Sequence, residues 1–291
     1  MKPAAFTYHR PDTVDEAVAM LSDLGDDAKV LAGGQSLIPM LAMRLAVFPH
    51  LIDIGRVAEL DAIEPSNGTV TIGAVTTQAR VEADPGLATS VPLMARATPL
   101  IGHFQIRNRG TVGGSLAHAD PAAEYPAVAL ALDASVEGVS ARGRRTIPAA
   151  EFFTGLWSTA LEPDELLARV RFPVWSGRCG FALQEFARRH GDFAIAGAVV
   201  GVQLGDDDRI ERAAIAHFGL GSTPGRARAV EGELTGLSAS DVAAGEVGRL
   251  AMSQVTEPAD DLQGSASYRL RVGAAMVERA WTRAIEEARR A

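Results

Sequence analysis

The chain has 291 residues, of which 47% are hydrophobic and 22% charged, which is an ordinary composition for a globular protein of one large or two modest domains. A net charge of −8 argues against a nucleic-acid partner, and no apolar run is long enough to cross a bilayer. The N-terminus lacks an apolar signal core and Cys179 is the only cysteine, so we expect a cytoplasmic protein without an iron–sulfur cluster of its own.

The first third of the chain alternates helix and strand patterns. A helix is predicted over 14–24, because Thr13 and Glu16 have the spacing of a capping box and Gly25 stands where a helix would end. The next elements in chain order are a strand over 29–32, a helix over 36–45, a strand over 50–54, and a hairpin of 61–63 and 69–72 that turns at Asn67-Gly68.

The remaining two thirds continue this mixed pattern. We expect a helix over 87–97, a Gly-rich turn over 111–116, a short apolar element over 126–132, a hairpin over 135–147, strands over 166–172, 181–188 and 210–218, a buried segment over 194–204, and a long amphipathic helix from Ser265. Pro173 and Gly177 mark a candidate boundary. The sequence therefore predicts an α+β N-terminal domain over 1–175 and a smaller α+β domain over 176–291.

Two Gly-Gly doublets suggest a ligand site. They lie in Ala-Gly-Gly-Gln-Ser at 32–36 and in Thr-Val-Gly-Gly-Ser at 111–115. Paired glycines let the backbone approach a ligand closely, and turns of this kind can point successive N–H groups at an anion. Two such loops could hold the two phosphates of a dinucleotide, although the spacing alone leaves a purely structural role equally open.

Other chemistries find little support in the sequence. There is no Gly-x-Gly-x-x-Gly fingerprint and no Gly-Lys-Ser or Gly-Lys-Thr, so neither a Rossmann domain nor a P-loop is predicted. The histidines show no metal-binding spacing, and no Gly-x-Ser-x-Gly elbow is present. We therefore predict no metal site and no catalytic acid, base or nucleophile. Among the histidines, His118 is of interest because it follows the second glycine doublet.

Four stretches carry a resemblance to a known family. VLAGGQSLIP at 30–39 resembles the first flavin-binding segment of the medium subunits of carbon monoxide dehydrogenase, xanthine dehydrogenase and related molybdenum hydroxylases, and QIRNRGTVGGSLAHADPAAEYP at 105–126 resembles the second. RRHGDFAI at 188–195 and ASYR at 266–269 also match. The resemblance runs nearly end to end.

The resemblance implies a fold and a cofactor site. The N-terminal domain would have the FAD-binding fold of the vanillyl-alcohol-oxidase type, with two α+β subdomains, and the C-terminal domain would be of the carbon monoxide dehydrogenase flavoprotein type. The residues implied to bind FAD are Ala32, Gly33, Gly34, Gln35, Ser36, Leu37, Ile101, Gly110, Thr111, Val112, Gly113, Gly114, Ser115, Ala117, Glu124, Leu167, Asp192 and Phe193. The two glycine segments would hold the pyrophosphate, Glu124 would lie near ribose or ribityl hydroxyls, and Asp192 and Phe193 would lie near the isoalloxazine ring.

The sequence departs from the family at two of these positions. The family usually has Asn where this chain has Ser115, so that an amide contact becomes a hydroxyl contact. Carbon monoxide dehydrogenases favour Tyr at the position of Phe193, and this exchange keeps the aromatic ring but removes a hydrogen bond. The second departure weakens any inference that the substrate is carbon monoxide.

The resemblance also implies an electron-transfer role. A large partner subunit would carry molybdopterin and oxidise the substrate, and a small one would carry two 2Fe–2S clusters, in a dimer of heterotrimers. FAD on this chain would pass electrons to an acceptor such as NAD, a quinone, a cytochrome or dioxygen. Two alternatives remain: an independent FAD-dependent oxidase or reductase with its own substrate, and a non-catalytic assembly subunit that has lost the cofactor.

Overall fold

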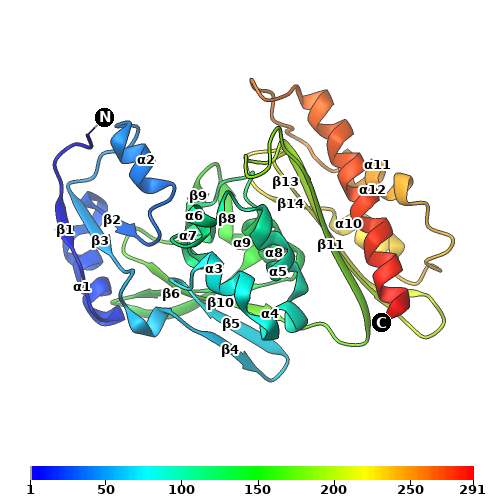
Figure 1. Cartoon of the computed structure of the whole chain (residues 1–291), viewed down its shortest axis with the longest axis horizontal. Helices are drawn as coiled ribbons and strands as arrows, with labels where there is room; N and C mark the ends of the chain where they lie inside the picture. The colour runs from blue at the N-terminus through cyan, green and yellow to red at the C-terminus, as the bar shows by residue number, and fades with distance from the viewer. Residues whose placement is uncertain (1) are drawn as a thin grey trace.

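The computed structural model describes residues 2–291 and places three main sheets one after another along the molecule (Figure 1). The first sheet is parallel, in the order β1-β3-β2, with β1 at Thr7–His9, β2 at Ala28–Leu31 and β3 at His50–Asp53. Helix α1 (Val14–Leu24) packs on it through Val14, Ala17 and Leu21. Short helix α2 (Leu37–Ala42) follows the first glycine doublet.

The middle sheet is antiparallel, in the order β4-β5-β10-β6-β7. Its strands are β4 (Ile63–Ser66), β5 (Thr69–Gly73), β6 (Ser135–Ser140), β7 (Gly143–Pro148) and β10 (Leu166–Pro173). Asn67 and Gly68 both have positive φ, at 43° and 78°, which confirms the predicted hairpin turn. The middle third also contains α3 (Gln78–Ala83), α4 (Pro85–Ser90), α5 (Pro92–Ala97), α6 (Phe104–Arg107), α7 (Val112–His118), α8 (Glu124–Ala131), α9 (Ala149–Phe152) and the small β8–β9 hairpin (Phe153–Gly155 and Ser158–Thr159).

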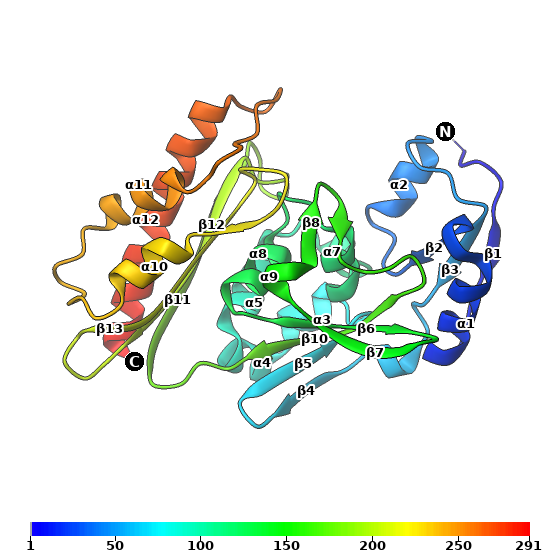
Figure 2. The ribbon, with the colours of Figure 1, turned by 180° about the vertical axis from the view of Figure 1, so that it is seen from behind.

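The third sheet is antiparallel and buried on both faces. It contains β11 (Arg178–Phe186), β12 (Ala196–Leu204), β13 (Ile210–Phe218) and β14 (Gly225–Arg226), followed by α10 (Arg228–Leu234), α11 (Ala244–Ser253) and α12 (Ala266–Arg290). Phe181 and Phe218 belong to the core that includes α5 and α8, whereas Ala182 and Ile215 belong to the core around α12. Figure 2 shows α12 and the shorter helices on the outer side of this sheet.

Several expected elements differ from the structure in their limits. The helix expected over 87–97 is split into α4 and α5, because Pro92 has no N–H to continue the first helix and starts the second. The expected turn over 111–116 is wrong: Thr111 is the N-cap of α7 and its hydroxyl accepts the N–H of Gly114. The helix expected over 36–45 spans only Leu37–Ala42. No helix within residues 2–291 is long and apolar enough to cross a membrane.

Candidate cofactor site

A cavity of about 710 Å³ is formed by residues of the N-terminal sheet, the middle third and the β11–β12 turn. This volume falls within the range of cofactor and ligand pockets, roughly 300–1,000 Å³. All but one of the predicted FAD-binding residues line it: Ala32, Gly33, Gly34, Gln35, Ser36, Leu37, Ile101, Gly110, Thr111, Gly113, Gly114, Ser115, Ala117, Glu124, Leu167, Asp192 and Phe193. Val112 does not line the cavity; it is the first residue of α7, and it is fully buried in the core.

The first glycine segment offers free backbone donors. Gly34 has φ +75°, and a Cβ on Gly33 would come within 2.2 Å of the carbonyl oxygen of Arg109, so the two glycine segments approach each other closely. Among the described residues, no protein group accepts a hydrogen bond from the N–H of Gly33, Gly34, Gln35 or Ser36. A run of unpaired N–H groups beside a cavity is suited to an anion such as a phosphate.

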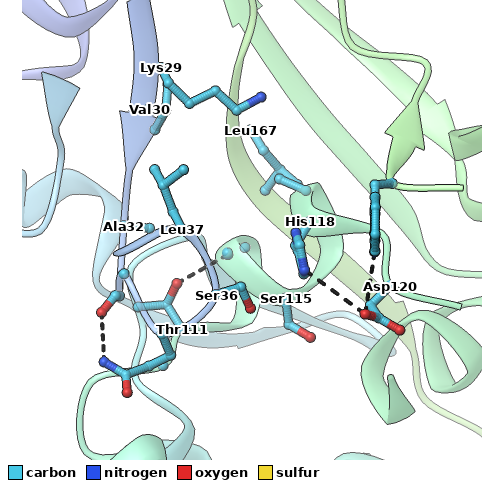
Figure 3. Close-up of a pocket in the computed structure, with 18 of the residues that line it drawn as sticks. Lys29, Val30, Ala32, Ser36, Leu37, Thr111, Ser115, His118, Asp120 and Leu167 are labelled. Carbon is cyan, nitrogen blue, oxygen red and sulfur yellow. Dashed lines mark hydrogen bonds and ion pairs between the residues drawn. The ribbon is translucent and has the colours of Figure 1, made fainter. Parts of the chain in front are cut away.

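The second glycine segment is different, because its N–H groups are used within the protein. Val112 donates to the carbonyl of Thr76 at 3.0 Å, and Gly113 donates to the carbonyl of Ala74 at 2.9 Å. A Cβ on Gly113 would lie 2.6 Å from the Cα of Ala74. Gly113 therefore lets α7 pack against the chain after β5, and the two doublets are not equivalent, although the sequence had suggested that they were. The side-chain hydroxyl of Ser115 remains available at the cavity wall (Figure 3).

A buried carboxyl group lines the same cavity. Glu124 begins α8 and is only 7% exposed, and no other residue within 2–291 donates a hydrogen bond to its carboxyl oxygens. Burial, and then the nearby Glu185, raise the pKa of Glu124 to about 8; burial raises the pKa of Glu185 to about 7. A buried polar group that lacks partners is costly, so Glu124 is suited to a ligand that supplies hydroxyl or N–H groups.

Gln78 and Lys29 line the cavity as well, and neither was predicted from the sequence. The Oε1 atom of Gln78 is buried without a partner in the described structure, and it lies 2.5 Å from where a Cβ on Gly110 would stand. Lys29 projects from β2, with its Nζ atom 5.7 Å from the centre of the Phe48 ring (Figure 3). Neither residue belongs to a motif. The strand pattern over 29–32 was the only signal that could have placed Lys29 beside the first doublet.

A second wall of the cavity carries three side chains that contact one another (Figure 3). The rings of His118 and Trp157 stack, and the indole Nε1 of Trp157 donates to Asp120 Oδ2 at 3.4 Å. His118 Nε2 lies 4.0 Å from the same oxygen. Burial lowers the pKa of His118 more than Asp120 raises it, so the imidazole is favoured in its neutral form.

The β11–β12 turn closes the cavity from the C-terminal part. Asp192 and Phe193 line it, and Phe193 is 56% exposed. Gly191 has φ +83°, and a Cβ there would lie 2.8 Å from the carbonyl oxygen of Gly102. The turn therefore fits closely against the segment before α6, and it brings together residues that are about ninety positions apart in the sequence.

Comparison with known proteins identifies the family. The FAD-binding domain of molybdopterin dehydrogenases matches residues 4–175, and the C-terminal domain of the carbon monoxide dehydrogenase flavoprotein matches residues 181–284. The chain belongs to this family of FAD-binding medium subunits and is an oxidoreductase subunit of the molybdenum hydroxylase type.

Three relatives illustrate the similarity. The chain is 43% identical to the alpha subunit of the 6-hydroxypseudooxynicotine dehydrogenase complex of Paenarthrobacter nicotinovorans, over 99% of this chain and 97% of that one. It is 40% identical to the beta subunit of caffeine dehydrogenase of a Pseudomonas species, over 98% and 97%. The solved structure of carbon monoxide dehydrogenase from Hydrogenophaga pseudoflava superposes with a TM-score of 0.95 at 39% identity, over 99% of both chains.

The residues of the cavity fit FAD. The unpaired N–H groups of residues 33–36 suit a pyrophosphate, and the buried carboxyl of Glu124 suits the hydroxyls of a ribityl or ribose chain. Apolar and aromatic side chains, among them Ile101, Leu167 and Phe193, supply surface for flat rings. No group of three or more metal-ligating side chains occurs within residues 2–291.

Proposed function

We propose that this chain holds FAD in the cavity and passes electrons from the iron–sulfur clusters of a partner subunit to an external acceptor. When bound, the flavin supplies the redox chemistry, because it accepts electrons singly or in pairs. The chain's own residues bind and orient it: the N–H groups of residues 33–36 hold the pyrophosphate, and Glu124 binds a hydroxyl. The observation that carries the proposal is the row of unpaired N–H groups beside a cavity of this size.

The partners follow from the same proposal. We propose a large molybdopterin subunit and a small subunit with 2Fe–2S clusters, assembled as a dimer of heterotrimers in the cytoplasm. The relatives support placing the substrate site on another chain, since subunits 43% and 40% identical to this one belong to dehydrogenases named for 6-hydroxypseudooxynicotine and for caffeine. Chains related to one another over nearly their whole length thus serve complexes with very different named substrates, which supports a substrate site outside this subunit.

An independent flavoenzyme is the second candidate, and the lining of the cavity argues against it. Such an enzyme would need convergent polar groups from the C-terminal part over the flavin. In the described structure, that part contributes only Gly191, Asp192 and Phe193 to the cavity wall. A substrate pocket of its own would require more side chains than this single turn supplies. The third candidate, a non-catalytic assembly subunit that has lost FAD, is disfavoured because the two glycine segments still approach each other closely.

The first test of this proposal is flavin content. Gly33→Val places side-chain atoms against the Arg109 carbonyl, so we expect the purified complex to lose its flavin absorption. Gly232→Val is the matched control, because Gly232 lies on α10, where a Cβ would meet no atom within 4 Å, and it does not line the cavity. Full flavin content in the Gly33 variant would refute the assigned site.

The second test follows the electrons. The clusters of the complex are reduced with dithionite, and their reoxidation by a short-chain quinone is followed by absorption. We expect fast reoxidation in the wild-type complex and at least tenfold slower reoxidation in the flavin-free Gly33→Val complex, a change of about 1.4 kcal/mol in the barrier. Equal rates in the two complexes would show that electrons leave without passing through this subunit.

A further inference from the structure

Arg269 is a buried cation that no part of the proposed binding site uses. It lies in the first turn of α12 and is 4% exposed. One guanidinium nitrogen, Nη1, donates to the carbonyl oxygens of Ile195 at 2.7 Å and Gly219 at 2.6 Å. The other, Nη2, donates to both carboxylate oxygens of Asp261, at 2.6 and 2.8 Å. A single side chain therefore joins three segments that lie apart in the sequence.

Two of these segments lead directly to the cavity wall. Ile195 stands two residues after Phe193, at the end of the β11–β12 turn. The N–H of Gly219 donates to the carbonyl of Pro121 at 2.7 Å, and Pro121 follows Asp120, which lines the cavity beside Trp157. Arg269 thus connects the segment that carries Phe193 through one hydrogen bond, to Ile195, and the segment that carries Asp120 through two in series, to Gly219 and from Gly219 to Pro121.

The geometry of this connection requires an arginine. A planar guanidinium presents its donors in a fixed fork, so one terminal nitrogen can donate to a carboxylate while the other donates to two carbonyl oxygens. Lysine has a single ammonium group and cannot span both sets of acceptors. The approach of the segments is also tight, because Gly219 has φ +73° and a Cβ there would lie 2.8 Å from the carbonyl oxygen of Ala194.

We propose that Arg269 is a positioning residue for the cofactor, which sets the separation of the Asp192–Phe193 turn and the Pro121–Asp120 segment across the flavin end of the cavity. The inference rests on the proposed FAD site. Arg269 itself does not line the cavity, and it acts only through the carbonyl groups of Ile195 and Gly219. Losing it leaves every cavity-lining side chain in place, and the Gly219–Pro121 hydrogen bond and the β12–β13 pairing remain, but it removes the only side-chain bonds among the described residues that hold the Ile195 and Gly219 carbonyls together.

The test compares Arg269→Lys with Arg226→Lys in the intact complex. Arg226 is a matched control: its side chain is 6% exposed, and it donates to Glu231, to Asp133 and to the carbonyl of Leu130, none of which lines the cavity. Each complex is stripped of flavin and titrated with FAD. The visible circular dichroism of the bound flavin is then recorded, because this signal depends on how the ring is held.

We expect both lysine variants to lower the thermal midpoint, since each loses bonds of a buried cation. Only Arg269→Lys is expected to weaken FAD binding, by about tenfold, and to change the flavin dichroism. If Arg269→Lys matches Arg226→Lys in both flavin measurements, Arg269 is only structural and the inference fails, while normal FAD binding by the wild-type complex would still uphold the proposed function. A wild-type complex that takes up no FAD would overturn both.

A second variant separates the contact of Arg269 with Asp261 from its contacts with the two carbonyl groups. Asp261→Asn removes the charge of one partner of Arg269 but keeps an oxygen that can accept its hydrogen bond, and it leaves both carbonyl bonds in place; because the Asp261 side chain is half-exposed, we expect the chain to fold. We expect nearly unchanged flavin dichroism in this variant, because the connection between the two walls is intact. A change as large as that of Arg269→Lys would contradict the assignment of the effect to the Ile195 and Gly219 carbonyls.

Discussion

The imidazole of His118 and the indole of Trp157 stack with their planes 12° apart and their centroids separated by 6.4 Å. The backbone of Trp157 has an unfavourable conformation. Its φ is +53°, in the left-handed region that bulky residues avoid, and its side chain is 54% exposed. The tip of the β8–β9 hairpin therefore holds a strained residue against the wall of the cofactor cavity, which is a common place for strain to be retained.

This strain can be measured by comparing two substitutions at one position. Trp157→Ala and Trp157→Gly remove the same stacking contact, but only glycine adopts positive φ without penalty. We expect Trp157→Gly to be more stable than Trp157→Ala by about 1 kcal/mol in denaturant unfolding. Equal stabilities, or a more stable alanine variant, would show that the hairpin tip relaxes and stores no strain.

The buried carboxyl of Glu124 predicts a pH dependence of the flavin-free protein. Its pKa is raised from 4.5 to about 8, so the folded state holds a proton that the unfolded chain has already released. Stability should then fall as the pH rises from about 4.5 to about 8, and level off above. Glu124→Gln should flatten this decline in urea midpoints measured from pH 5 to pH 9. Glu151→Gln, at an exposed position, serves as the control and should leave the slope unchanged.

His217 predicts the opposite trend on the acid side. Burial lowers the pKa of this histidine from 6.5 to about 4, and its Nδ1 atom has no hydrogen-bond partner in the described structure. Between these two pH values His217 is protonated in the unfolded chain but neutral in the folded protein, so stability falls as the pH drops from about 6.5 to about 4. We expect His217→Asn to reduce this slope, whatever its effect at neutral pH. An unaltered slope would place the acid sensitivity in other groups.

Gly113 and Gly232 should respond oppositely to the same added methyl group. Gly113→Ala forces a Cβ against the Cα of Ala74 and should destabilise the protein by about 1–3 kcal/mol, the usual cost of overpacking. Gly232→Ala adds a methyl group to a helix at an open position and should stabilise by about 0.5–1 kcal/mol. Denaturant unfolding measures the free energy of unfolding of both variants. An unchanged free energy of unfolding in Gly113→Ala would mean that α7 shifts easily.

The sequence predicted elements best where the local signal was strong. The Thr13 cap of α1, the Asn67-Gly68 turn and the long C-terminal helix from Ser265 were all correct. The sheet orders and the split at Pro92 depend on tertiary packing, which one sequence does not show. Short helices such as α3 and α6 were missed because four to six residues give too few repeats to establish a period.

For the site, the family resemblance located the lining residues, and the structure shows which of their backbone N–H groups have no acceptor within the protein. The residues did not reveal that the N–H groups of 33–36 are unpaired while those of 112–115 are used. For Val112 and Gly113 that difference depends on Thr76 and Ala74, which are far from either doublet in the sequence. The membership of the N-terminal domain in the vanillyl-alcohol-oxidase type of fold remains a prediction, as do the proposed domain limits at 175 and 176.

The two-sided burial of the third sheet limits how this protein could be recombined. One face of β11–β13 completes the core of α5 and α8, and the other completes the core of α12. A chimera that joined the N-terminal part of one relative to the C-terminal part of another would have to match side chains such as Phe181 and Phe218 across the seam. We therefore expect a graft that exchanged one segment without the facing side chains of the other to lose stability at this interface, even with every residue of the cofactor cavity unchanged.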